Sequence, residues 1–309
     1  MRPARHNRHV SSARHIVVAV NPTAAAGKNA RAGDETVRQL EAAGHAVIRV
    51  QAESAGALRD ALAARTAEFD TLVVVGGDGM VSLGVNLLAA TNKALAVVPA
   101  GTGNDFARGL GYEVGDLAGS VARTVAAVAH PPVRIDLALV AGAHGERLVA
   151  GVVSAGFDAL VNERANRMRF PRGHSKYTIA IFRELLALRP RRYELSVDGV
   201  LGSGEAVLIS VANNSYMGGG MWVSPASALS DGLLEVFRVH PVSRRRLVRL
   251  LPTVFEGKHV VEPEVEITPA RSVTIDAAGV VAYGDGERIG PLPIQVDVRP
   301  QSLWLHRPN

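Results

Sequence analysis

Two glycine-rich segments in the first half of the chain carry residues suited to phosphate chemistry. They read VVVGGDGMVS at residues 73–82 and VVPAGTGNDFARGLG at residues 97–111. Glycines in a turn between a strand and a helix let backbone N–H groups approach an anion closely. Each turn also holds a carboxylate, Asp78 or Asp105, which would repel a phosphate unless a cation lay between them. Mg²⁺ bound with a nucleoside triphosphate meets this requirement, so the turns predict phosphoryl transfer.

Common nucleotide-binding motifs do not account for these segments. Pro22 stands where a Walker A loop needs its first glycine, and Asn29 follows Gly27-Lys28 in place of serine or threonine. GTGNDF at residues 101–106 begins like a dinucleotide-binding motif but has phenylalanine at the position of the third glycine. The sequence therefore favours neither a P-loop NTPase nor a Rossmann dehydrogenase.

Strand-like and helix-like segments alternate over residues 16–132 and predict an α/β domain with a doubly wound parallel sheet. Continuous apolar runs are typical of strands that are covered on both faces. Ligands of this fold bind at the carboxyl ends of the strands, where both glycine turns lie. The expected strands are 16–20, 45–51, 71–75 and 94–98, and the expected helices are 30–43, 81–90 and one marked by Leu58, Leu62 and Ala63.

Short alternating runs separated by turn residues predict a mostly antiparallel second domain. The boundary is expected near His130-Pro131-Pro132, which gives a nucleotide-binding α/β domain over 16–132 and a β-rich domain over 133–296. Residues 297–309 are expected to return to the first domain, and residues 1–15 are expected to be a flexible basic tail. The expected strands are 133–140, 147–156, 192–199, 205–213, 233–239, 264–270, 272–279 and 294–300.

Composition excludes several classes of site. The 309-residue chain has no cysteine, so disulfides, cysteine–zinc sites and thiol nucleophiles are excluded, and a reducing cytoplasm is compatible. Its ten histidines show no metal-binding spacing such as HExxH. No apolar run reaches the ~18 residues of a membrane span, and the basic N-terminus lacks the apolar core of a signal peptide.

One stretch, residues 162–192, interrupts the β pattern and concentrates positive charge. It contains nine arginine and lysine residues and two glutamates, whereas the whole chain has a net charge of +5. Tyr177, Ile181, Phe182 and Leu185 provide an apolar face at helical spacing. Such a segment either lies on an anionic membrane or packs on the core as a helix with a solvated basic rim, and both interpretations stay open.

The glycine turns belong to a longer series of motifs that resembles a known family. The series is similar to that of the diacylglycerol kinase catalytic family of soluble bacterial lipid kinases. The resemblance implies a nucleotide domain akin to those of phosphofructokinases and NAD kinases, followed by a β-sandwich-like domain. It also implies ATP and Mg²⁺ as cofactors and a lipid hydroxyl as the acceptor. The motifs are NPTAAAGKNA (21–30), GGDGMVS (76–82), PAGTGNDFAR (99–108), AGFDA (155–159), SDGLLEV (230–236) and YGDGERIG (283–290).

The resemblance assigns nucleotide-binding roles to three of these segments. Asp78 in the GGDG turn is tied to Mg-ATP or to positioning of the acceptor, although an aspartate there could instead cap a helix. Asn104 or Asp105 could likewise cap the short helix that follows the second loop. The nucleotide-binding positions implied by the resemblance are Asn21, Pro22, Gly27, Gly76, Gly77, Gly79, Ser82, Gly101, Thr102, Asn104 and Asp105.

Two further carboxylates match functional positions of the family. Glu287 in the GDGE motif resembles the general base, which accepts the proton of the attacking hydroxyl. Without the family context it would simply follow Asp285-Gly286, a good hairpin turn. Asp231 matches a position that binds a structural Mg²⁺ together with main-chain carbonyls, here those of Ala228 and Leu233, but it could equally be a plain turn aspartate.

Two positions depart from the family pattern, in which threonine is usual. Met80 follows the GGDG turn, and Ala52 precedes the second helix. A thioether neither donates to a phosphate oxygen nor binds Mg²⁺ well. We therefore expect the contact of the missing threonine to be lost or to pass to Ser82.

Together with the resemblance, the residues predict an ATP- and Mg²⁺-dependent kinase that converts diacylglycerol to phosphatidate at the inner face of the membrane. The GTGND form of the second loop favours this branch over sphingoid-base kinases. A kinase for another lipid, a NAD kinase-like enzyme and a catalytically degraded nucleotide-binding module remain alternatives. The expected partners are the lipid substrate and an anionic membrane surface; no nucleic acid partner is expected, and a homodimer is left open.

Overall fold

The computed structural model describes most of the chain. The expected basic tail up to residue 12, Pro22, and most of the segment 162–192 lie outside the described residues. The described residues are 13–21, 27–156, 160–161, 163–164, 168, 179–180, 183–184 and 189–308.

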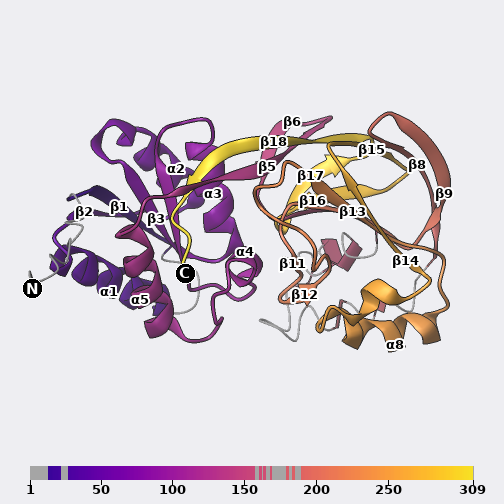
Figure 1. The fold of residues 1–309 in the computed structure, drawn as a ribbon, viewed down its shortest axis with the longest axis horizontal. Coiled ribbons are helices and arrows are strands. Elements are labelled where there is room, and N and C mark those ends of the chain that lie inside the picture. The colour runs from indigo at the N-terminus through magenta and orange to yellow at the C-terminus, as the bar shows by residue number, and fades with distance from the viewer. Residues whose placement is uncertain are drawn as a thin grey trace, which may run out of the picture.

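A parallel sheet with helices on both faces forms the N-terminal half, as the alternating pattern predicts (Figure 1). Its strands run in the order β2-β1-β3-β4, and all are paired in parallel. The elements are β1 (His15–Val20), α1 (Lys28–Ala42), β2 (Ala46–Gln51), α2 (Ala55–Ala63), η1 (Thr66–Glu68), β3 (Thr71–Gly76), α3 (Asp78–Leu88), β4 (Ala94–Pro99), α4 (Asp105–Gly109) and α5 (Leu117–Val128).

The period-two alternation of the strands divides their side chains between two buried clusters. Val17 and Ala19 face α2 and α3, whereas Ile16 and Val18 face α1 and α5. Both faces of the sheet are therefore apolar, which explains why the strands read as continuous hydrophobic runs.

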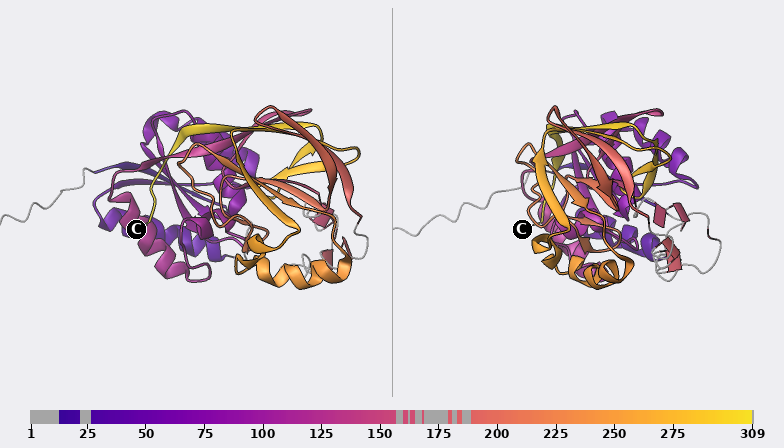
Figure 2. Two further views of the ribbon diagram at one scale, coloured as in Figure 1. Left: turned by 45° about the vertical axis from the view of Figure 1, so that its right-hand side comes forward. Right: turned by 90° about the vertical axis from the view of Figure 1, so that its right-hand side faces the viewer.

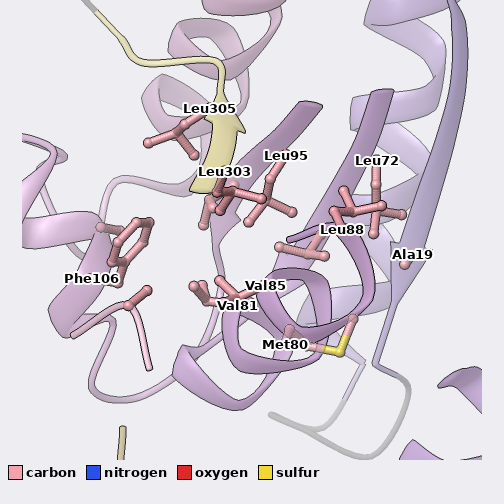
Figure 3. Close-up of a cluster of buried hydrophobic side chains, with 14 of the residues drawn as sticks. Ala19, Leu72, Met80, Val81, Val85, Leu88, Leu95, Phe106, Leu303 and Leu305 are labelled. Carbon is pink, nitrogen blue, oxygen red and sulfur yellow. The ribbon is translucent and has the colours of Figure 1, made fainter. Parts of the chain in front are cut away.

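The cluster on the α3 side also takes in the end of the chain (Figure 3). Val81 and Leu88 of α3 lie in it with Leu95 of β4 and with Leu303 and Leu305 near the C-terminus. Burial of each such side chain contributes about 1.5–3 kcal/mol. This packing fixes α3, and with it the glycine turn from which α3 starts.

Antiparallel strands form most of the described C-terminal half, together with an 11-residue helix and a two-stranded ribbon. A six-stranded sheet has the order β14-β13-β10-β7-β16-β17. The elements are β5 (Val133–Gly142), β6 (Gly145–Val149), β7 (Val152–Gly156), β8 (Arg191–Val197), β9 (Val200–Ala206), β10 (Leu208–Ala212), β11 (Tyr216–Met217), β12 (Met221–Trp222), β13 (Leu234–Val239), α8 (Arg244–Val254), η2 (Lys258–Val261), β14 (Val265–Ala270), β15 (Ser272–Asp276), β16 (Val281–Gly284), β17 (Glu287–Pro291) and β18 (Ile294–Leu305).

Two sheets pack against each other in this half, which gives it the expected sandwich-like character. Val140 of β5 and Val273 of β15 belong to one sheet, and Val153 of β7 and Ile209 of β10 belong to the other. All four side chains lie in a single buried cluster.

One sheet runs without interruption through both halves of the molecule. β18 pairs in parallel with β4 at Trp304 and Leu305, and along most of its length it pairs antiparallel with β5. These two long strands cross from one half to the other (Figures 1 and 2). The residues at 130–132, where the sequence suggests a boundary, immediately precede β5, so the halves are joined by a shared sheet.

The expected strand at 147–156 is wrong in one respect, because it is two strands. β6 ends at Val149 and β7 begins at Val152, and the residues between them break the ladder. Likewise, the run 205–213 is divided between β9 and β10. Among the described residues, no helix is both long enough and apolar enough to span a membrane.

Candidate active site

The two glycine turns pack directly against each other at the carboxyl ends of β3 and β4. A Cβ atom on Gly101 would lie 2.4 Å from the Cα atom of Gly77, so no side chain fits at this contact. Asn104 has a left-handed backbone, and its side chain holds the second turn. Its Oδ1 accepts from the N–H of Gly101 at 2.9 Å, and its Nδ2 donates to the Gly101 carbonyl at 2.9 Å. The glycines thus allow a close approach that brings the two loops together.

Asp78 is the first residue of α3, but its side chain caps a different helix. Its Oδ1 accepts from the N–H of Phe106, at the start of α4, at 3.1 Å. The capping role considered for Asn104 and Asp105 is therefore wrong, because neither side chain caps α4. Asp78 Oδ2 accepts no hydrogen bond from the described residues and lies near Gly103, where a Cβ atom would come within 2.9 Å of it.

Asp105 ties the second glycine loop to the C-terminal half. Its two carboxylate oxygens accept from the N–H groups of Gly219 and Gly220, at 2.8 and 2.7 Å, in the turn between β11 and β12. Burial, helped by the nearby charge of Asp78, raises the pKa of Asp105 to about 6 despite these donors. The side chain therefore fixes one wall of the site relative to the other.

Asp285 also accepts hydrogen bonds from backbone N–H groups that are distant in sequence, within the C-terminal half. It lies with Gly286 in the two-residue turn between β16 and β17, where both residues have positive φ. Its carboxylate accepts from the N–H groups of Ala150, Gly151 and Val152 at 3.1 to 3.3 Å, in the break between β6 and β7. Burial and the charge of Asp78 raise the pKa of Asp285 to about 7.

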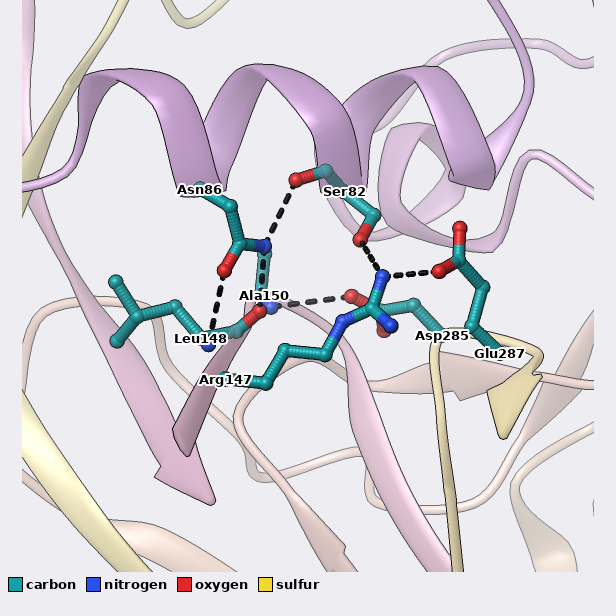
Figure 4. A network of polar contacts seen from close by, with 7 residues as sticks. All are labelled: Ser82, Asn86, Arg147, Leu148, Ala150, Asp285 and Glu287. Atoms are coloured by element: carbon teal, nitrogen blue, oxygen red, sulfur yellow. Dashed lines mark hydrogen bonds and ion pairs between the residues drawn. The ribbon is translucent and has the colours of Figure 1, made fainter. Parts of the chain in front are cut away.

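Glu287, at the start of β17, is held by an arginine from the neighbouring sheet (Figure 4). Arg147 on β6 forms an ion pair with Glu287, and the same nitrogen donates to Ser82 Oγ at 3.0 Å. The Glu287 side chain is 43% exposed, so it stays accessible to a substrate. Ser82 is buried, and its hydroxyl is directed at Arg147.

A cleft of about 380 Å³ lies between the glycine turns and the C-terminal half. Of the residues singled out by the sequence, Asp78, Thr102, Asp105 and Glu287 line it, together with Gly77 and Gly79. The other lining residues are Gly103, Phe106, Gly151, Val152, Ser154, Tyr216, Met217, Gly218, Gly219, Asp285 and Gly286.

The remaining expected nucleotide-binding residues that the structure describes do not line this cleft. Gly76, Gly101 and Asn104 lie in or beside the turns. Gly101 packs on Gly77, Gly76 packs on Met80, and Asn104 hydrogen-bonds to Gly101. Asn21 follows β1, and Gly27, with a left-handed backbone, is the N-cap residue that precedes α1. Their contribution to nucleotide binding stays a prediction.

Comparison with known proteins identifies the family. The model described as "Diacylglycerol kinase catalytic domain" matches residues 15–140, and that described as "YegS C-terminal NAD kinase beta sandwich-like domain" matches residues 151–307. The diacylglycerol kinase of Mycobacterium tuberculosis (strain ATCC 25618 / H37Rv) is 36% identical over 297 residues, which cover 95% of each chain. The chain belongs to the diacylglycerol kinase family of lipid kinases.

More distant relatives agree with this assignment. A Yersinia enterocolitica protein named "Probable lipid kinase YegS-like" is 27% identical to this lipid kinase, over 92% of this chain and 96% of its own. The crystal structure of a diacylglycerol kinase from Bacillus anthracis str. Sterne shares the fold, with a TM-score of 0.71 at 20% identity, and covers 96% of this chain and 97% of its own.

The expected structural Mg²⁺ position of this kinase has the geometry of a turn. Asp231 is exposed, and its carboxylate accepts from the N–H of Leu233, two residues on, at 3.0 Å. Ala228 is exposed as well. Among the described residues, no three histidine, aspartate or glutamate side chains converge as a metal site. Metal binding through Asp231 and main-chain carbonyls therefore stays a prediction.

Two functional features of the kinase site could not be recognised in the sequence. Arg147 is one arginine among many, and nothing nearby in sequence marks its contact with Glu287, 140 residues away. Asp285 is visible in the GDGE motif, but only as a turn residue. The break between β6 and β7, which supplies its three N–H donors, is hidden inside an unbroken apolar run.

Proposed function

We propose that this kinase transfers the γ-phosphate of ATP to the hydroxyl group of diacylglycerol, giving phosphatidate, with Mg²⁺ as the required cation. The observation that carries the proposal is the placement of Glu287 opposite the first glycine turn. A Cβ atom on Gly79 would lie 3.7 Å from Glu287 Oε1. A proton acceptor thus faces the loop best suited to hold the phosphates.

The phosphate-binding role of the turns follows from their backbone. Gly77 and Gly79 stand at the start of α3, where free N–H groups and the helix dipole favour an anion. Thr102, in the second turn, adds a hydroxyl that can donate to a phosphate oxygen. The triphosphate would therefore lie along the wall formed by the two turns.

The carboxylates of the site fit one Mg²⁺ that is shared with the phosphates. Asp105 and Asp285 already use their oxygens to accept backbone N–H groups. Asp78 Oδ2 accepts no hydrogen bond from the described residues and is left to bind a cation. Mg²⁺ commonly uses one or two carboxylates and completes its shell with substrate phosphates and water. Such an ion would neutralise phosphate charge beside Asp78.

Glu287 supplies the base for the acceptor alcohol. A hydroxyl that attacks a phosphorus atom must lose its proton as the new bond forms. A carboxylate within hydrogen-bond reach can accept that proton, and Glu287 is both exposed to the cleft and fixed by Arg147. The position of the base therefore defines where the acceptor hydroxyl must lie.

Diacylglycerol is the acceptor that the relatives favour. The M. tuberculosis protein carries the name of that activity, whereas the Y. enterocolitica protein is named only as a lipid kinase. Because diacylglycerol stays in the bilayer, the proposal places the protein at the cytoplasmic face of the membrane as a peripheral enzyme.

The test is to incubate the protein with labelled ATP, Mg²⁺ and a total lipid extract, and to identify the lipid that gains phosphate. The proposal expects labelled phosphatidate that disappears without Mg²⁺ and in the Glu287→Gln variant. Label in a sphingoid base or another lipid would reassign the acceptor. Labelled NAD in a parallel assay, or ATP binding with no labelled product, would favour a NAD kinase-like enzyme or a degraded module.

A further inference from the structure

The outer face of α8 combines exposed apolar and basic side chains. Val248 on α8 and Phe255, the residue just after its end, are 49% and 51% exposed. Arg244, Arg245 and Arg249 are also exposed. Spacings of three, four and seven residues put these side chains on one side of the helix. We refer to these five residues as the α8 surface.

The opposite side of α8 holds the helix to the protein. Leu250 is buried, Leu247 packs against a cluster that contains Phe237, and Val254 packs against a cluster that contains Met217. The inner face therefore supplies the packing that the helix needs. About half of the surface of Val248 and of Phe255 stays exposed on the other side, next to the exposed arginines, and a surface that combines apolar and basic side chains suits an interface.

The arginines of the α8 surface are free to meet an external anion. None of the three forms an ion pair within the part of the chain that the structure describes. Arg246 differs, because it turns inward and pairs with Glu262 and Glu264 at 2.5 and 2.9 Å. Glu256, two residues after the end of α8, is paired with Lys258.

A chain of contacts connects the end of α8 to the cleft. Trp222 of β12 lies against Gly257, three residues after the end of α8, since a Cβ atom on Gly257 would come within 3.0 Å of its ring. Trp222 stacks on Tyr216 at 5.7 Å between ring centroids, and Tyr216 lines the cleft. In Figures 1 and 2 the helix lies at the lower edge of the molecule in every view.

We propose that the α8 surface docks on an anionic lipid bilayer. Val248 and Phe255 enter the boundary between headgroups and acyl chains, while Arg244, Arg245 and Arg249 pair with lipid phosphates. The charge of the unpaired arginines selects an anionic membrane over a neutral one. The proposal rests on the proposed function, because it supplies the contact that a kinase for a bilayer lipid needs.

Sedimentation with vesicles tests the surface without any enzymatic step. The variants are Val248→Ser with Phe255→Ser, and Arg244→Gln with Arg245→Gln and Arg249→Gln. Matched controls are Val200→Ser with Leu201→Ser, which are 73% and 84% exposed on β9, and Arg38→Gln with Arg59→Gln and Arg65→Gln on the N-terminal half. The arginine control removes the same charge at another place, the apolar control replaces two exposed apolar side chains by serine at another place, and thermal melting checks that every variant folds.

We expect both α8 variants to lose roughly tenfold or more in partitioning onto phosphatidylglycerol-containing vesicles. The controls should partition as the parent does, and all proteins should bind phosphatidylcholine vesicles weakly. Equal partitioning of parent and α8 variants would overturn the proposal, and so would equal losses in the α8 variants and the controls.

Activity on a short-chain diacylglycerol dispersed in detergent separates this proposal from the proposed function. An α8 variant that keeps this activity but loses activity on vesicles supports the docking surface. A parent protein that binds anionic vesicles through the α8 surface, yet phosphorylates no diacylglycerol in detergent, supports docking while it removes the proposed acceptor.

Discussion

Arg147 on β6 forms an ion pair with Glu287 on β17, and the same nitrogen of Arg147 donates to Ser82 on α3. The arginine thus links the helix that starts at the first glycine turn to the hairpin that carries the proposed base. Because Arg147 does not line the cleft, we expect it to act on the reaction through Glu287, as a positioning residue.

The Arg147→Met variant should lower kcat roughly tenfold, because a base that is no longer fixed spends less time in the productive geometry. The KM for ATP should change little, since Arg147 does not line the cleft and contacts the side chains of Ser82 and Glu287. Arg147→Lys keeps the positive charge and should recover part of the rate. Steady-state kinetics on the detergent-dispersed substrate measures kcat and the KM for ATP of the parent and of both variants.

A double-mutant cycle shows whether the effect passes through Glu287. In a Glu287→Gln background, Arg147→Met should have little further effect, because the group that it positions is already gone. A loss of the same factor in both backgrounds would mean that Arg147 acts on another part of the site.

The Glu287→Gln substitution tests the base itself. Glutamine keeps the size of the side chain but cannot accept the proton, so kcat should fall by ~10²–10⁴-fold. ATP affinity, measured by equilibrium binding, should stay near that of the parent. Near-normal turnover would assign the base to another group.

The Asp78→Asn substitution tests the proposed cation ligand. We expect activity to be abolished at ordinary Mg²⁺ concentrations, because Oδ2 is the oxygen available to the ion. Partial recovery at raised Mg²⁺ indicates a metal-binding role. Asparagine can still accept from the N–H of Phe106, so thermal stability should change little. A large loss of stability without recovery would point to a structural role.

Substitution of Met80 should change the stability of the protein more than its affinity for the nucleotide. Its side chain is 4% exposed and lies in the buried cluster beside Gly76, where a Cβ atom would come within 2.5 Å of it. The Met80→Thr variant carries the hydroxyl that is usual in the family. It should lose about 2 kcal/mol of unfolding free energy, and its KM for ATP should not fall. Met80→Leu keeps the volume and should cost less than ~1.5 kcal/mol. A lower KM in the threonine variant would show that the hydroxyl reaches the nucleotide.

The local parts of the architecture could be predicted because neighbouring residues encode them. Each glycine turn follows a buried strand and precedes a helix, so its place at the carboxyl end of a parallel sheet follows from the pattern. That placement was enough to bring Asp78 and Thr102 to the same wall. The side-chain alternation on β1 similarly predicts helices on both faces.

The rest depends on contacts between residues that are far apart in sequence. The oxygens of Asp105 meet N–H groups 114 and 115 residues away, and those of Asp285 meet N–H groups more than 130 residues away. No local period signals such pairs, which arise from the way β5 and β18 join the two halves. The burial of the Met80 side chain could not be predicted either, because its position next to the GGDG motif suggests a contact with the nucleotide.

The burial of His306 should make the free energy of unfolding depend on pH. It is 1% exposed beside Thr71, and burial, together with the charge of Arg14, lowers its pKa to about 4. The unfolded chain binds a proton near pH 6.5 but the folded chain does not, so this residue makes stability fall as the pH drops from about 6.5 to 4. The cost reaches about 3 kcal/mol at the lower end.

The His306→Gln variant lacks this titration, whereas all other groups are shared with the parent. It should be less stable than the parent at pH 7, because a packed ring is lost, and the gap should narrow by about 2–3 kcal/mol toward pH 4. Urea unfolding of both proteins across this range measures the difference directly. A gap that stays constant with pH would show that His306 binds its proton in the folded chain as readily as in the unfolded one.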